Sequence, residues 1–199
     1  KLSFLLFIAT LPTWIGAANV LFKSVEKPYI DKTKTVLSSP ALDIVFISNG
    51  ENQAEYLYHL LKTAVEDQPN RLVRVQDVKG RVAAYQTAAR VSTTPWFFAV
   101  FAKLEVDLQF PWDWQPDRMQ QAKHYIFHAE NPINGLVYGH QAMIAYNKNL
   151  VLANNNPGID FTLSQPHESV PVLSGTAHYD QDAWTTWRTA FREVIKLCL

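Results

Sequence analysis

Apolar runs alternate with amphipathic stretches along the chain after residue 40. A continuous apolar run at 42–47 ends in Ser48-Asn49-Gly50 and predicts a buried strand. Apolar residues then recur at helical spacing over 54–64, which predicts a helix. The same succession follows again, with a strand expected at 71–75, a helix at 82–91 and a further strand at 96–104.

This alternation predicts an α/β fold with a mostly parallel central sheet flanked by helices, because βαβ crossovers place helices on both faces. The pattern changes after Asp107. Short strands at 124–129 and 142–146 predict a smaller mixed-strand cap, and an amphipathic stretch at 184–197 predicts a closing helix. Ligands of parallel sheets bind at the carboxyl ends of strands, so one crevice is expected between residues 48–51, 76–81 and 101–107.

The first 40 residues differ from the rest. Residues 2–11 are mostly apolar and follow Lys1, which is typical of a signal peptide but also of a buried strand bounded by Pro12. Pro12 ends this run well short of the roughly 20 apolar residues that a membrane span needs. Residues 22–40 are polar, as in a linker. We therefore expect an N-terminal extension and linker at 1–40, alternatively the end of a preceding unit, and one domain at 41–199.

Composition narrows the classes of function. Eighteen basic and eighteen acidic residues give a formal charge of zero, so no overall field attracts nucleic acid. The single cysteine, Cys198, excludes an intrachain disulfide and a thiolate metal cluster. Apolar residues make up 48% of the chain, as in globular proteins. We expect a soluble protein without a membrane span.

Five segments carry a resemblance to a known family. They are 43–51, 78–81, the strand that closes at Lys103, 131–140 and 187–193. In this order they resemble a family of phage-encoded, glycosyltransferase-like proteins with a GT-A type, Rossmann-like fold. The resemblance implies a nucleotide-sugar-binding domain in the host cytoplasm during phage infection or in the virion. It also implies partners among sibling units of the same polypeptide or other phage proteins.

Members of that family carry an acidic Asp-x-Asp pair where this chain has Phe101-Ala102-Lys103. Two carboxylates would bind a divalent cation that neutralises a diphosphate, whereas these three side chains hold no metal. The ammonium of Lys103 can offset the same charge, so we expect a metal-independent site without a cofactor. The alternatives are a lysine paired with Glu105 or Asp107 at a strand edge, or a shifted acidic pair formed by those two carboxylates.

The nucleotide has candidate contacts at two strand ends. The resemblance places its base and ribose against the end of the first strand, at Ser48, Asn49 and Glu51, although Asn-Gly is also a plain turn signal. Lys79 and Arg81 flank a glycine at the start of the second helix, where exposed amides and basic side chains favour phosphate. A solvated helix start is the alternative.

The acceptor end has four candidate residues. His167 and His178 are expected to shape it, and Trp112 and Trp114 to stack on sugar rings, with core packing as the alternative for both tryptophans. The six histidines lack the spacing of a metal-ligand cluster.

We therefore predict a domain that binds a nucleotide sugar without a metal and, if active, transfers the sugar by direct displacement. Asp160 would act as the general base and Lys103 would face the diphosphate. A helical or turn cap at 161–163 is the alternative role of Asp160. The alternative function is a non-catalytic GT-A-like structural or virion assembly module, since one fold hosts many functions. A nucleotidyltransferase is a third alternative, but it would need the missing acidic pair to hold magnesium.

Overall fold

The structure is a computed structural model that describes residues 39–154, 160–178 and 182–197. The expected extension at 1–40 lies almost wholly outside the described residues, as does Cys198. In chain order the elements are β1 (Asp43–Ser48), α2 (Ala54–Ala64), β2 (Leu72–Gln76), α3 (Arg81–Val91), β3 (Trp96–Phe101), β4 (Leu104–Val106), β5 (His124–Asn131), β6 (Leu136–Asn147), α4 (Lys148–Ala153), β7 (His167–Ala177) and α5 (Ala183–Leu197).

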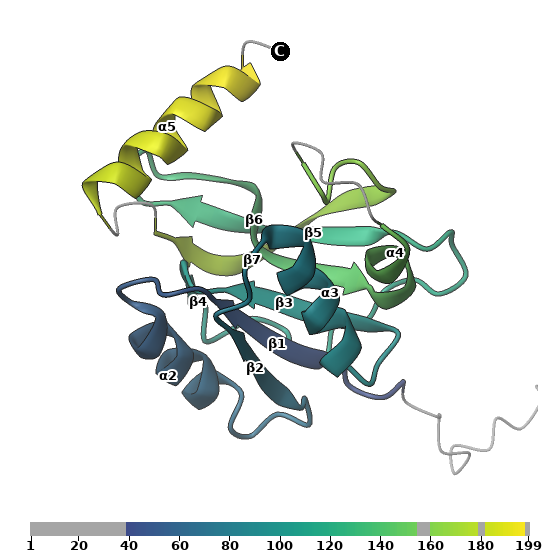
Figure 1. Cartoon of the computed structure of the whole chain (residues 1–199). Coiled ribbons are helices and arrows are strands. Elements are labelled where there is room, and N and C mark those ends of the chain that lie inside the picture. The colour runs from purple at the N-terminus through teal and green to yellow at the C-terminus, as the bar shows by residue number, and fades with distance from the viewer. Residues whose placement is uncertain (1–38, 155–159, 179–181, 198–199) are drawn as a thin grey trace, which may run out of the picture. The chain divides into compact units, whose positions relative to one another are not determined.

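The fold is α/β, and its strands form a mixed sheet in the order β2-β1-β3-β6-β5-β7-β4 (Figure 1). The strands β2, β1 and β3 are parallel, as the alternation of strands and helices predicts. The expectation of a mostly parallel sheet is not confirmed: β5 and β7 are also parallel, but β6 is antiparallel to both β3 and β5, and β4 is antiparallel to β7. The reason is a tight turn after Asn131, where Gly135 has φ +67°, which joins β5 and β6 as a hairpin without a crossover helix.

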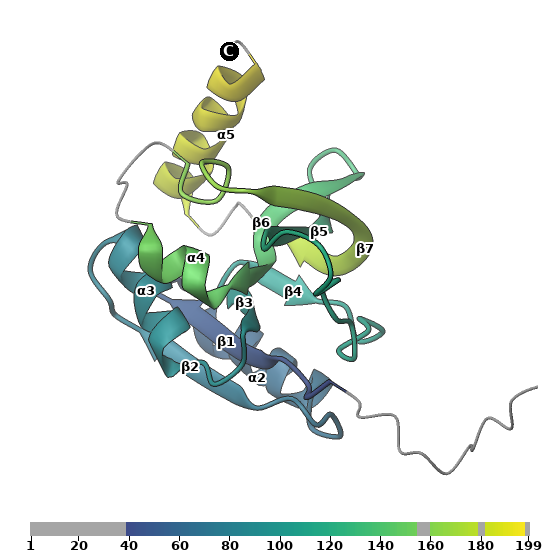
Figure 2. The ribbon, with the colours of Figure 1, turned by 90° about the vertical axis from the view of Figure 1, so that its right-hand side faces the viewer.

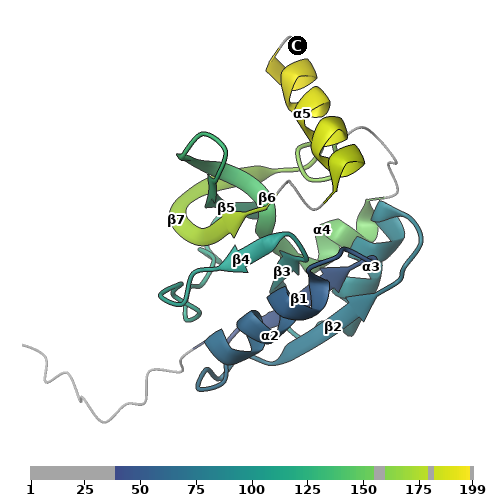
Figure 3. The same cartoon turned by 90° about the vertical axis from the view of Figure 1, so that its left-hand side faces the viewer.

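The predicted strand at 96–104 is interrupted. The Lys103 N–H donates to the Phe101 carbonyl at 2.7 Å, a three-residue turn that ends β3 and starts β4 in a new direction. β4 then pairs with β7 at the far end of the strand order, although only two residues separate it from β3. The sheet must therefore curl until its far edge returns to the end of β3, as Figures 2 and 3 show.

Helices cover the two faces of the sheet around separate cores. On one face, Leu57 and Leu61 of α2 pack with Phe98 and the aromatic residues that follow β4. On the other face, Tyr85 and Ala88 of α3 pack with residues of α4 and β6. These two layers cover both faces of the sheet around β1, β2 and β3, whose carboxyl ends form the candidate site.

The amino ends of the parallel strands are tied together by the buried Asp43 carboxylate. It accepts hydrogen bonds from the Arg71 guanidinium at 3.2 and 2.7 Å. The backbone N–H and the hydroxyl of Thr93 also donate to it, at 2.5 and 2.9 Å. Burial alone would raise the pKa of this carboxyl, but the bonds from Arg71 and Thr93 outweigh burial and hold the pKa below its usual value.

We expect Asp43→Ala to lower the free energy of unfolding by about 2 kcal/mol, because Thr93 loses its acceptor and Arg71 its partner. The effect stays moderate since the Arg71 side chain is 47% exposed and water can solvate it. Urea denaturation at neutral pH measures the change, with the exposed Asp113→Ala as the matched control. Equal stability of the two variants would contradict this role of Asp43.

The closing helix is present as α5, but its apolar side is not covered by the sheet. Trp187, Phe191 and Val194 are each more than half exposed. Among the described helices, none combines the length and the hydropathy that crossing a bilayer requires.

Candidate functional site

The carboxyl ends of β1, β2 and β3 lie side by side at one edge of the sheet. The Asp77 N–H, just after β2, donates to the carbonyl of Ser48 at the end of β1, at 3.2 Å. The Ala102 N–H, just after β3, donates to the Ile47 carbonyl at 3.0 Å. The strand-end residues expected around one crevice are therefore brought together, since each backbone is bonded to its neighbour.

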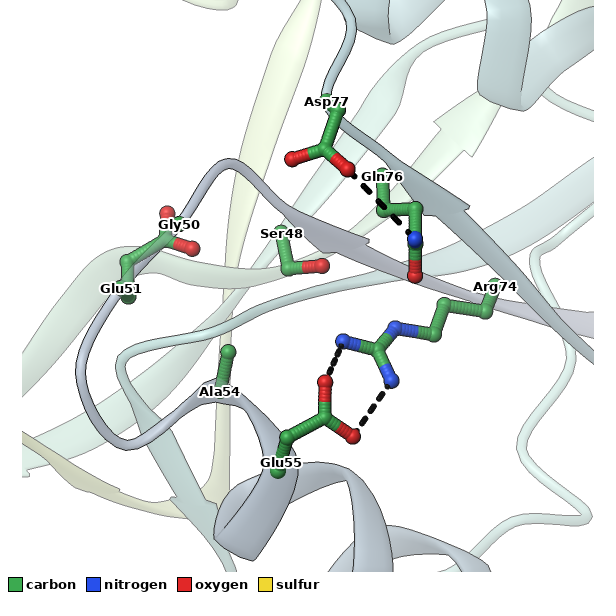
Figure 4. A pocket seen from close by; sticks show the side chains of 8 residues that line it. All are labelled: Ser48, Gly50, Glu51, Ala54, Glu55, Arg74, Gln76 and Asp77. Atoms are coloured by element: carbon green, nitrogen blue, oxygen red, sulfur yellow. Dashed lines mark hydrogen bonds and ion pairs between the residues drawn. The ribbon is translucent and has the colours of Figure 1, made fainter.

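A pocket of about 170 Å³ opens between the ends of β1 and β2 and the start of α2 (Figure 4). Its lining consists of Ser48, Gly50, Glu51, Ala54, Glu55, Arg74, Gln76 and Asp77. Ser48 and Glu51 were expected here from the sequence. The position of the pocket follows the rule that open α/β sheets bind ligands at strand carboxyl ends.

An ion pair forms part of the pocket lining. The two terminal nitrogens of Arg74 donate to the two Glu55 oxygens at 2.8 and 2.5 Å, and Figure 4 shows these groups facing each other. The hydrogen bond raises the pKa of Arg74 and lowers the pKa of Glu55, so both remain charged. The guanidinium also lies 4.9 Å from the centre of the Tyr58 ring. Arg74 is thereby fixed in place, with its charge offset by Glu55.

The pocket rim is formed by two turns of unusual backbone conformation. Asp77 has φ +58°, a left-handed conformation that non-glycine residues adopt rarely and often at binding sites. Gly50 has φ +83°, and the Glu51 carboxylate accepts a hydrogen bond from the Asn49 N–H at 2.6 Å. The Asn-Gly turn expected from the sequence is therefore present, and it points Glu51 back onto its own loop.

The start of α3 follows directly on the pocket. Gly80 is the residue that precedes the helix and has φ +92°, and no side chain caps the helix N-terminus. Lys79 and Arg81 flank this glycine and are both exposed. Two cationic side chains and a positive helix end thus lie two to four residues beyond Asp77.

Lys103 and His178 lie next to each other, although 75 positions separate them in the chain. The backbone N–H of His178 donates to the backbone carbonyl of Lys103 at 2.7 Å, and the ring Nε2 of His178 lies 2.8 Å from a Glu105 carboxylate oxygen. Lys103 itself is partly buried in the turn between β3 and β4. The curl of the sheet therefore brings the paired side chains of His178 and Glu105 next to the backbone of Lys103, just after β3.

Asp160 lies near the same edge but its oxygens are engaged. One oxygen accepts from the Thr162 and Leu163 N–H groups at 3.1 and 3.0 Å, and the other accepts from the Gln141 amide at 2.8 Å. The first pair of bonds is the capping role that the sequence left open. Gln141 belongs to β6 and is two residues from Met143, which pairs with Val100 of β3.

Three other expected site residues lie elsewhere. Trp112 is 2% exposed and packs edge-on against Phe98 and Phe110, so its ring belongs to the core. Trp114 packs against Tyr125 and other core rings. His167 begins β7, which runs parallel to β5, so it lies at the amino edge of the sheet, opposite Lys103. These three side chains are not brought to the crevice.

Four pocket residues were not singled out from the sequence: Glu55, Arg74, Gln76 and Asp77. For Gln76 and Asp77 the strand-end rule already contained the signal, since both follow the second strand. Arg74 of β2 and Glu55 of α2 form an ion pair between two separate elements, and no pattern in the sequence near either residue predicts this pair. Within the ranges that the structure describes, no three His, Cys, Asp or Glu side chains converge as a metal site would require.

Comparison with known proteins yields distant similarities in structure. No protein-family model matches the sequence, and no curated protein is similar to it. HddC from Yersinia pseudotuberculosis is 10% identical, with 76% of this chain and 99% of that chain covered and a TM-score of 0.42. The 4-diphosphocytidyl-2C-methyl-D-erythritol synthase of Anaerococcus prevotii is 8% identical, with 75% and 99% covered and a TM-score of 0.44.

A third similar structure is a glycosyltransferase involved in the glycosylation of the major capsid of PBCV-1. It is 12% identical, with 55% of this chain and 62% of that chain covered and a TM-score of 0.35. TM-scores this low establish neither a shared family nor a shared activity.

Proposed function

We propose that this domain binds a nucleotide sugar at the carboxyl edge of β1, β2 and β3 without a divalent metal. The observation that carries the proposal is a polar pocket at the carboxyl ends of β1 and β2. The end of β3 is bonded alongside β1, and Lys103 follows it in the chain. Such an edge is where open α/β sheets bind nucleotides. The order of sequence motifs that resemble phage-encoded glycosyltransferase-like proteins supports the same ligand class.

The charges divide the site into two parts. Three carboxylates, from Glu51, Glu55 and Asp77, and one guanidinium, from Arg74, line the pocket. An excess of acceptors suits the hydroxyls of a ribose and the amino group of a base, and it disfavours phosphate. We therefore place the nucleoside in the pocket.

The diphosphate would then lie on the basic side of the edge. Lys79 and Arg81 at the start of α3 and Lys103 after β3 supply positive charge, and the α3 N-terminus adds exposed amides. In this arrangement the Lys103 ammonium stabilises the negative charge that develops on the leaving diphosphate.

Sugar transfer also requires a base for the acceptor hydroxyl. The acceptor oxygen would bond to the anomeric carbon while the bond from that carbon to the diphosphate oxygen breaks, and the hydroxyl proton would pass to the base. Asp160 is the candidate from the sequence. His178 is a second candidate, because Glu105 holds its Nε2 and leaves Nδ1 as a proton acceptor.

The binding step is tested by thermal denaturation of the full chain with a panel of uridine, guanosine, cytidine and thymidine diphosphate or monophosphate sugars. We expect one donor to raise the apparent melting temperature, and we expect the shift to persist with a chelator. Lys103→Ala should weaken donor binding by about 10- to 100-fold, as expected for the loss of one charge-assisted contact. Asp77→Ala should weaken it as well.

Lys62→Ala is the matched control, because Lys62 lies in the last turn of α2, away from this edge. The proposal would be contradicted if a chelator abolished the shift in melting temperature. It would also be contradicted if Lys103→Ala left the shift as unchanged as Lys62→Ala does. A donor that binds without any release of free nucleotide in the presence of acceptors would favour the non-catalytic module.

A further inference from the structure

Helix α5 exposes a row of aromatic and aliphatic side chains. Trp184, Trp187, Phe191 and Val194 are each 53–66% exposed. The rings are stacked along the helix, with centroids 5.4 Å apart for the two tryptophans and 5.5 Å apart for Trp187 and Phe191. In Figure 1 the helix is the yellow ribbon beyond the sheet. Large contiguous apolar surface of this kind marks an interaction site.

The same helix carries a local excess of positive charge. Arg188, Arg192 and Lys196 recur at intervals of four residues in its sequence. Glu193 is its single acidic residue, so the three basic residues leave a net charge of +2 on α5, whereas the whole chain is neutral. The occupant of this face should therefore combine an apolar layer with negative charge.

A second copy of the chain fits these observations poorly. A helix of 15 residues is about 22 Å long, and one face of it offers a few large side chains. Stable protein interfaces bury about 800 Å² on each partner, which is more than one such face supplies. Two copies would also bring like charges together.

The N-terminal segment of the same chain, residues 1–38, fits poorly as well. Residues 1–38 carry five lysines against Glu26 and Asp31, a net charge of +3. This segment would add positive charge beside a helix that is already basic, and electrostatic repulsion would oppose the contact.

We propose that α5 binds the surface of an anionic lipid bilayer and lies in the plane of the interface. Amphipathic helices with Trp and Phe on one face and Arg and Lys beside it bind this way, with the apolar face in the headgroup and acyl boundary. Tryptophan is enriched at that depth, and each basic residue adds attraction to anionic headgroups. The proposal goes beyond nucleotide-sugar binding and stands independently of it.

The test is co-sedimentation of the full chain with vesicles of phosphatidylcholine alone or with roughly one-third phosphatidylglycerol. We expect binding to the anionic vesicles, a decrease with added salt and a blue shift of tryptophan fluorescence. The double variant Trp187→Glu, Phe191→Glu should bind at least 10-fold more weakly, and Arg188→Gln should weaken binding to anionic vesicles only.

Ile133→Glu is the matched control, since Ile133 is 71% exposed on the β5–β6 turn and its change should leave vesicle binding intact. Circular dichroism and the melting temperature verify that each variant is folded. Absence of vesicle binding by the unaltered chain would overturn the proposal, and so would equal binding by the double variant. A dimer in solution that the double variant abolishes would assign the face to a second copy instead.

Discussion

Replacing Gly175 by alanine is expected to lower the free energy of unfolding by roughly 4 kcal/mol, from backbone strain and a steric clash together. Gly175 in β7 has φ +143°, and a Cβ atom there would lie 2.0 Å from the Glu105 carbonyl oxygen of β4. That neighbour is backbone and cannot rotate away. The two strands would have to separate where Val106 pairs with Gly175.

Gly175→Ala is also expected to disturb the groups around Lys103. The β4–β7 pairing brings His178 to Lys103 and Glu105, so we expect Gly175→Ala to disperse these three groups even where the rest of the sheet survives. Donor binding in the nucleoside pocket should weaken less than any turnover, because the strands that line the pocket, β1 and β2, pair with neither β4 nor β7.

Gly135→Ala is a control that measures the cost of the positive φ alone, without a steric clash. Gly135 also has positive φ, at +67°, but nothing lies within 4 Å of an added Cβ atom. We expect a loss of only about 1 kcal/mol for this variant. Urea denaturation measures both, and similar losses for the two variants would show that the close approach of β7 to β4 is not as described.

Stability is expected to fall steeply as the pH drops from 6.5 to 4, through the fully buried His124. Its Nδ1 accepts a hydrogen bond from the Asn147 N–H at 3.1 Å, which requires the neutral ring, and Nε2 lies 2.8 Å from the Gln165 carbonyl oxygen. Burial is the main cause that lowers the pKa of His124. The bond to Gln165 opposes burial and the nearby His167 adds to it, and together they bring the pKa from 6.5 to about 4.

Proton linkage determines that stability falls, and does not rise, as the pH is lowered. Below pH 6.5 the unfolded chain takes up a proton at this position and the folded chain does not, so acid favours unfolding. The free energy of unfolding should decrease by up to about 1.4 kcal/mol per pH unit, or roughly 3 kcal/mol over the interval, until the folded ring is protonated as well. The lowered pKa of Asp43 acts in a separate range, below the ordinary carboxyl value of 3.8, and removes stability only there.

Urea denaturation at several pH values between 7 and 4 measures the slope. His124→Gln should be less stable at pH 7 but should lose this dependence, since it has no titrating ring. His59→Gln, at an exposed histidine on α2, should keep the slope of the unaltered chain. A slope that survives in His124→Gln would assign the acid sensitivity to another group.

Local patterns in the sequence determined the strands and helices around the nucleoside pocket. The pattern of apolar residues predicted β1, α2, β2 and α3 within two residues of their ends. The fully buried β1 is a continuous apolar run, and α2 buries one face, so both leave a local pattern in the sequence. The strand-end rule depends only on parallel order, so it could indicate that Ser48 and Glu51 lie at the pocket and that Lys103 follows β3, while their roles in binding stay predictions.

Only the tertiary structure decided the partners of the later strands. The curl of the sheet decides that β4 pairs with β7. It also decides that His178 lies next to Lys103, while His167 lies at the opposite edge. The sequence around Trp112 is compatible with a ring that stacks on a sugar and with a ring in the core. In the structure, Trp112 is buried against Phe98. Periodicity reports which face of a segment is buried, but strand pairing is a contact between distant segments, and its choice is made by the packing of the whole sheet.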